Sequence, residues 1–118
     1  MSGHIDDAAF GQTLEMVGGD MGFLNELVAA YRNDGVSRLT DMRTALAAAN
    51  AEDLRRAAHT LKGSSASLGA NALAEACREV ELAAREGRLE GLAAKVDAIA
   101  AQFDEVVSAL EARTRSGG

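Results

Sequence analysis

The sequence contains no proline and no tryptophan, and aromatic residues make up only 3% of it. Residues that favour strands, such as isoleucine, tyrosine and phenylalanine, are scarce. Alanine, leucine, glutamate and arginine dominate instead, and these residues favour helices. The composition of these 118 residues therefore predicts an all-α protein, and an apolar fraction of 47% can supply a small core.

Other features that the sequence lacks limit the possible functions and the cellular location of the protein. The single cysteine, Cys77, cannot form a disulfide within the chain, which fits a reducing compartment. The formal net charge of −6 disfavours non-specific binding of nucleic acid. No apolar run is long enough to span a bilayer, and the N-terminal segment lacks the basic and apolar regions of a secretory signal. We therefore expect a cytoplasmic protein that binds neither nucleic acid nor membranes.

The spacing of apolar residues predicts five helices. A short helix over about 6–17 ends at two glycines, Gly18 and Gly19. Asp20 is a suitable N-cap for a long helix that runs to about residue 50, with Gly35 inside it. Three further helices are predicted over about 51–68, 71–87 and 89–112.

Four long amphipathic helices joined by short turns predict an antiparallel up-down four-helix bundle, with the short N-terminal helix as a lid. The sequence has no flexible linker, low-complexity run or repeat of fixed period. We therefore expect a single domain over residues 1–118 with an ordered core over about 6–112, and frayed ends at 1–4 and 115–118. Since one bundle can close its own core, we expect a monomer.

The predicted third helix presents one histidine on its polar side. On a helical wheel of about 100° per residue, Leu54, Leu61 and Leu68 fall on the side opposite His59. The apolar side of the helix must face the core. The imidazole of His59 should therefore point to solvent.

Cationic and small residues surround this histidine on the wheel. Arg55, Arg56 and Lys62 lie within about 60° of it, and the nearest residues toward the C-terminus are Gly63 and Ala66. A neutral imidazole nitrogen is a competent nucleophile near neutral pH, and cations could offset the charge of a phosphoryl group placed on it. The glycine, which costs about 1 kcal/mol relative to alanine, would let another protein approach the ring closely. Exposed histidines and cations on helices are nevertheless common, so on the wheel alone an idle surface histidine is the better interpretation.

The segment His59–Ala70 reads HTLKGSSASLGA. It closely resembles the signature of histidine-phosphotransfer (HPt) domains of bacterial and plant phosphorelays, in which Lys-Gly follows the histidine by three and four residues, a small residue comes next and a glycine follows shortly. The segment 73–87, with Cys77, Glu81 and Gly87, resembles the fourth-helix segment of that family. The resemblance covers about residues 6–110.

The resemblance implies a function for the histidine. His59 would be phosphorylated on Nε2, Lys62 would lie beside the phosphoryl group, Gly63 would keep the docking surface open, and Ala66 would belong to that docking face. Arg55 and Arg56 are not fixed by the motif and remain possible electrostatic helpers. HPt domains have no kinase activity of their own. They exchange the phosphoryl group with the aspartate of a response-regulator receiver domain or receive it from a sensor histidine kinase. The Mg²⁺ that the transfer needs belongs to the receiver, so no cofactor or metal of its own is expected.

Other residues with possible chemistry are better explained structurally. Cys77 lies on the apolar stripe of its helix and is expected in the core. Ser65 should face inward, where it packs or bonds to its own backbone. His4 lies in the N-terminal tail and is expected to be a bystander, and two such histidines with one cysteine do not make a metal site. Four apolar residues near the lid could form a docking patch, but sealing the end of the bundle is the preferred interpretation; they are Phe10, Val17, Met21 and Phe23.

Two other functions compete with the phosphoryl carrier. A helical adaptor that binds signalling partners without being phosphorylated fits the composition, and it would leave His59 idle. The dimerising histidine-bearing helix pair of a sensor kinase fits poorly, because Thr60 stands where an acid normally follows the histidine and no nucleotide-binding domain is present.

Overall fold

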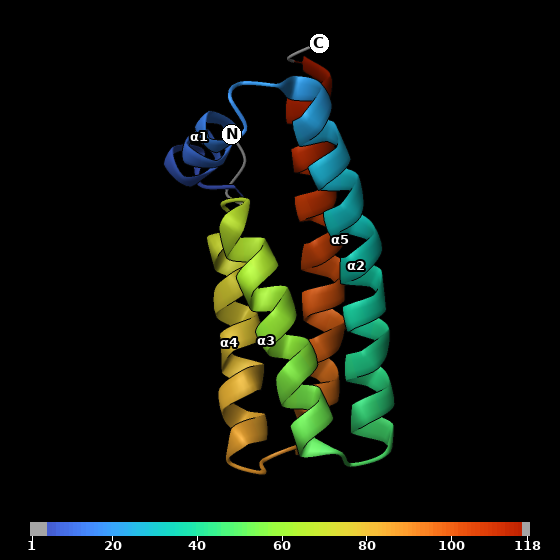
Figure 1. The fold of residues 1–118 in the computed structure, drawn as a ribbon. Coiled ribbons are helices and arrows are strands. Elements are labelled where there is room, and N and C mark those ends of the chain that lie inside the picture. Colours follow the sequence, from blue (N-terminus) through green and yellow to red (C-terminus); the bar gives the residue numbers. More distant parts are fainter. Residues whose placement is uncertain (1–4, 117–118) are drawn as a thin grey trace.

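The computed structural model describes residues 5–116, and within these every regular element is a helix. The five helices are α1 (Asp7–Met16), α2 (Met21–Ala47), α3 (Ala51–Ser67), α4 (Asn71–Arg85) and α5 (Leu92–Ser116) (Figure 1). This confirms the all-α prediction. His4, for which a bystander role was predicted, lies outside the described residues.

The helix ends follow the local signals in the sequence. The side chains of Asp20 and Asn50 cap α2 and α3, because their oxygens accept the backbone N–H groups of Phe23 and Asp53 at 3.0 and 3.1 Å. α5 departs most from the predicted range, since it begins at Leu92 and continues four residues past the predicted end at 112. Gly91 adopts φ +80° immediately before α5, a left-handed conformation that suits glycine and delays the start of the helix.

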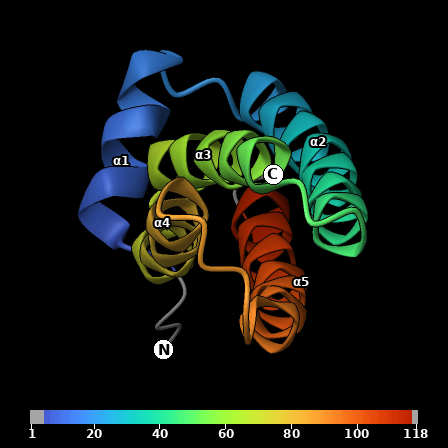
Figure 2. The ribbon, with the colours of Figure 1, turned by 90° about the horizontal axis from the view of Figure 1, so that it is seen from below.

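Helices α2, α3, α4 and α5 lie side by side, and consecutive helices run in opposite directions (Figure 1). α3 lies between α2 and α4, and α5 contacts both α2 and α4 on the other side of the core (Figure 2). Because α3 packs against a helix on each side, only one strip of its surface remains exposed. That strip carries the predicted functional residues.

The short helix α1 packs on α3 at the end of the molecule where α3 ends and α4 begins (Figure 1). The Asp6 N–H donates to the Gly69 carbonyl at 2.7 Å, and Arg113 of α5 pairs with Asp7 at 2.6 Å. Arg113 also lies over the Phe10 ring, 5.3 Å from its centroid. Contacts to both α3 and α5 therefore hold α1 in place.

The four apolar residues near α1 divide between core and surface. Phe10 is buried, Met21 and Val17 are half-buried, and Phe23 is exposed. Phe10 and Met21 therefore help to seal the end of the bundle, whereas Phe23 does not.

The core explains three small or polar residues inside helices. A Cβ on Gly35 would lie 2.2 Å from ring carbons of Phe103, so α2 and α5 can approach this closely only because residue 35 is glycine. Ser65 faces inward, as predicted, but its hydroxyl bonds to the hydroxyl of Tyr31 at 2.7 Å and not to its own backbone. Cys77 is buried, as predicted, and burial raises its pKa to about 12.

Candidate functional site

His59 lies near the middle of α3, on its exposed strip. Leu54 and Leu61, on the opposite side of the helix, are fully buried in the core. The His59 side chain retains 61% of its exposure. The structure therefore agrees with the helical wheel on the direction of this imidazole.

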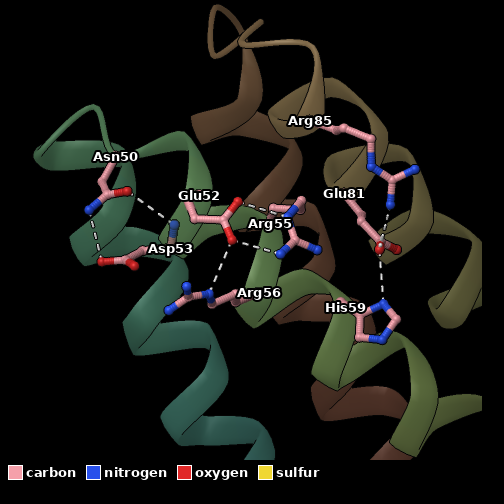
Figure 3. Close-up of polar contacts among 8 residues, drawn as sticks. All are labelled: Asn50, Glu52, Asp53, Arg55, Arg56, His59, Glu81 and Arg85. Atoms are coloured by element: carbon pink, nitrogen blue, oxygen red, sulfur yellow. Dashed lines mark hydrogen bonds and ion pairs between the residues drawn. The ribbon is translucent and has the colours of Figure 1, made fainter.

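The closest partner of His59 is a buried carboxylate, Glu81 of α4, which is only 3% exposed (Figure 3). Its Oε2 lies 2.9 Å from His59 Nδ1 and 3.3 Å from an Nη of Arg85. Its other oxygen, Oε1, lies 2.7 Å from Lys62 Nζ. Glu81 thus joins one imidazole and two cations from α3 and α4.

Glu81 is ionised, although burial opposes its charge. Burial by itself raises the pKa of this carboxyl, but hydrogen bonds from Lys62 and His59 outweigh it and hold the pKa below its ordinary value. An ionised carboxylate only accepts hydrogen bonds, so His59 Nδ1 must carry the proton of this contact. In the neutral form of the ring, the unprotonated nitrogen is then Nε2, which points away from Glu81 (Figure 3).

The two arginines that the wheel places near His59 are engaged with a neighbouring acid. Arg55 donates twice to Glu52, at 2.9 and 2.7 Å, and Arg56 donates to the same carboxylate at 3.2 Å (Figure 3). These contacts, first of all the hydrogen bond from Arg55, lower the pKa of Glu52 to about 2. Glu52 therefore offsets part of the charge of both arginines, and Arg56 also lines a hollow between α2 and α3.

Gly63 and Ala66 extend the exposed strip toward the C-terminal end of α3. A Cβ on Gly63 would meet nothing within 4 Å, so no internal contact requires glycine at this position. Ala66 lines a hollow of about 370 Å³ between α1, α2 and α3, together with Met16 and Leu27. The strip is therefore open at Gly63, and about two helical turns beyond His59 it borders a mostly apolar hollow.

Sequence reasoning assigned no role to Glu81 or Arg85. The signal for Glu81 was an acid on the apolar stripe of α4, between Cys77 and Ala84. Its pairing with His59 joins residues 22 positions apart and depends on the register of α3 against α4. Arg85 follows Glu81 by one helical turn.

Among residues 5–116, no group of three or more histidine, cysteine, aspartate or glutamate side chains could hold a metal ion. Within the same residues, no helix combines the length and the apolarity that crossing a membrane requires.

Comparison with known proteins identifies the family. The family model of the Hpt domain matches residues 26–112, which include the whole site described above. The chain belongs to the Hpt family. It is a histidine phosphotransfer protein of a phosphorelay.

A solved structure resembles this Hpt domain closely. The crystal structure of histidine-containing phosphotransfer protein B (HptB) from Pseudomonas aeruginosa PAO1 matches with a TM-score of 0.89 and 28% sequence identity, over 98% of each chain. No curated protein matches the sequence. The all-helical fold and the phosphotransfer class that the sequence motif predicted are therefore confirmed.

Proposed function

We propose that His59 accepts the phosphoryl group on Nε2 and relays it to or from the aspartate of a receiver domain. One observation carries this proposal: Glu81 accepts a hydrogen bond from Nδ1 of an exposed imidazole, so Nε2 is the nitrogen left without a contact. A nucleophile needs an available lone pair and an open line of approach. Nε2 of His59 has both.

In the forward step, Nε2 attacks the phosphorus of a phosphorylated aspartate of the partner. The Nε2–P bond forms as the P–O bond to the aspartate breaks, and the carboxylate leaves with the electron pair. Because Nδ1 keeps its proton, the phosphorylated ring is a cation, and Glu81 stabilises that charge. The reverse step returns the phosphoryl group by the same path.

Five other residues support the transfer in this proposal. Lys62 Nζ has three N–H donors, so it can hold Glu81 and still reach the phosphoryl oxygens. Arg55 and Arg56 add positive potential near the ring, reduced by their contacts with Glu52. Gly63 leaves the docking surface open, and Ala66 belongs to that surface.

We propose further that the protein carries the phosphoryl group and has no kinase activity of its own. We place the Mg²⁺ of the reaction in the receiver domain, and we expect no modification of His59 by ATP alone. We interpret α2–α5 as an antiparallel up-down bundle with α1 as its lid, which acts as one monomeric module. Either a sensor kinase or a receiver can be the donor.

The test is a transfer experiment with a purified, phosphorylated receiver domain and Mg²⁺. The wild-type chain should gain acid-labile, base-stable phosphate, and His59→Gln should gain none. Label that persists in His59→Gln would refute the site. Label formed from Mg·ATP alone would refute the carrier without kinase activity.

The competing adaptor function makes a different prediction in the same experiment. A non-catalytic adaptor would bind the receiver with equal affinity in the wild type and in His59→Gln, and neither would acquire phosphate. Binding without label, found with donors that phosphorylate other histidine carriers, would therefore favour the adaptor.

A further inference from the structure

The antiparallel packing of α3 and α4 places cations on both sides of His59. The His59–Glu81 contact fixes the register of the two helices. Moving three or four residues along a helix covers about 4.5–6 Å, so residues equally far from this contact in opposite directions face each other. Two cationic pairs result: Arg55 opposite Arg85 at one end, and Lys62 opposite Arg78 at the other.

Arg78 has no assigned role in the proposed chemistry. Its guanidinium is half-exposed and binds Glu75 of the same helix at 2.9 Å. The hydrogen bond to Glu75 and the charge of that carboxylate raise the pKa of Arg78, and the negative charges of Glu79 and Glu81 raise it further. Glu79 itself pairs with Lys95 of α5, on another side of α4.

The face that α3 and α4 form around His59 is positive in an acidic protein. Four cations of the described chain meet three carboxylates there: Arg55, Lys62, Arg78 and Arg85, against Glu52, Glu75 and Glu81. The local excess is one positive charge, whereas the whole chain carries −6. The rest of the surface is correspondingly more negative. An approaching acidic partner is therefore attracted to one face and repelled by the others.

We propose that the α3–α4 face, with Arg78 at its edge, steers the acidic surface that surrounds the transfer aspartate of a receiver domain. This inference rests on the proposed function and adds the electrostatic selection of the partner. The chemistry that fits the face is a cluster of carboxylates, because the local charge of the site has the opposite sign. A basic or neutral surface is not attracted to the α3–α4 face, and it is not repelled by the acidic faces elsewhere on the protein.

The test compares charge reversal at Arg78 with charge reversal at a matched arginine. Arg43 of α2 is the control, because it is 52% exposed against 50% for Arg78 and pairs with one acid, Asp97 of α5, at 3.1 Å. This pair joins α2 to α5, and α3 lies between α2 and α4 (Figure 2). Arg78→Glu and Arg43→Glu change the net charge equally.

The measurement is kcat/KM for phosphoryl transfer from a phosphorylated receiver with Mg²⁺, over a series of NaCl concentrations. At low salt, Arg78→Glu should lower kcat/KM about tenfold relative to Arg43→Glu, with kcat unchanged, because steering acts on encounter. The difference should shrink as salt rises, since the screening length is about 10 Å at 0.1 M and about 3 Å at 1 M. Arg78→Gln should give a smaller loss in the same direction, and thermal melting should show that all variants fold.

The outcomes separate this inference from the function on which it rests. If Arg78→Glu and Arg43→Glu transfer equally at low salt, the steering face is refuted while the carrier function stands. If the loss at Arg78 is the same at every salt concentration, the residue acts by contact and steering is again refuted. If the wild-type chain accepts no phosphoryl group at all, the proposed function is refuted, and this inference is refuted with it.

Discussion

Gly35 and Gly63 both lie inside helices, and the structure predicts opposite results when each is replaced by alanine. At Gly35, an added Cβ would lie 2.2 Å from ring carbons of Phe103, in the closed core. At Gly63, an added Cβ would meet nothing within 4 Å. The same change of one methyl group therefore tests two different reasons for a helical glycine.

The expected changes in stability follow from these surroundings. Alanine in an exposed helix interior is better than glycine by about 0.5–1 kcal/mol, so Gly63→Ala should raise the free energy of unfolding by about that amount. For a chain of this size, that corresponds to a rise of about 2–4 °C in Tm. Gly35→Ala should lower the free energy of unfolding by about 1–3 kcal/mol, because the core must move to admit the methyl group.

Function should change in the opposite direction at Gly63. If this glycine leaves room for a docked receiver, the methyl group should cost about 1 kcal/mol in the complex, which is about a fivefold loss in kcat/KM for phosphoryl transfer. Gly35→Ala, where it remains folded, should transfer at the wild-type rate. The assays are urea unfolding and transfer kinetics on the same protein samples.

Either of two results at Gly63 would refute this reasoning. If Gly63→Ala is more stable and transfers as fast as the wild type, the glycine has no role in access. If Gly63→Ala is less stable than the wild type, position 63 is not surrounded by open space in the folded protein.

Two further predictions concern buried groups. Because the folded-state pKa of Glu81 is lowered, its ionic contacts contribute stability that is fully present above about pH 4.5 and is lost as the pH falls through the folded pKa. The difference in the free energy of unfolding between the wild type and Glu81→Gln should therefore shrink from pH 6 to pH 3, and ¹⁵N NMR of His59 should show a mixture of ring tautomers in the variant. A difference that does not depend on pH, or an unchanged tautomer, would contradict the role of Glu81. Cys77, whose pKa burial raises to about 12, should resist iodoacetamide at pH 8 in the folded protein and react once urea unfolds it, as mass spectrometry can follow. Rapid alkylation of the folded protein would show that the thiol is not held in the core.

The helices and the exposure of His59 were predictable from the sequence, because both depend on short-range order. The caps at Asp20 and Asn50 act on residues three positions away, and the apolar stripe of α3 fixes the direction of the histidine within a few turns. The contacts of Arg55 and Arg56 with Glu52 could also have been predicted from the sequence, since they span only three and four residues. The helical wheel around His59 included these arginines as cations but not Glu52, the acid that shares their helix face.

The long-range contacts of the site and the core could be identified only from the tertiary structure. The Glu81 carboxylate reaches His59 across 22 residues, and the Phe103 ring requires glycine at position 35 across 68. Such pairs depend on the register and distance between packed helices, which no local spacing determines. The sequence by itself determined that an exposed histidine stands on a helix of an all-α chain. Only the packing of α3 against α4 decided which of its nitrogens holds the proton, because the carboxylate that selects the tautomer lies on the neighbouring helix.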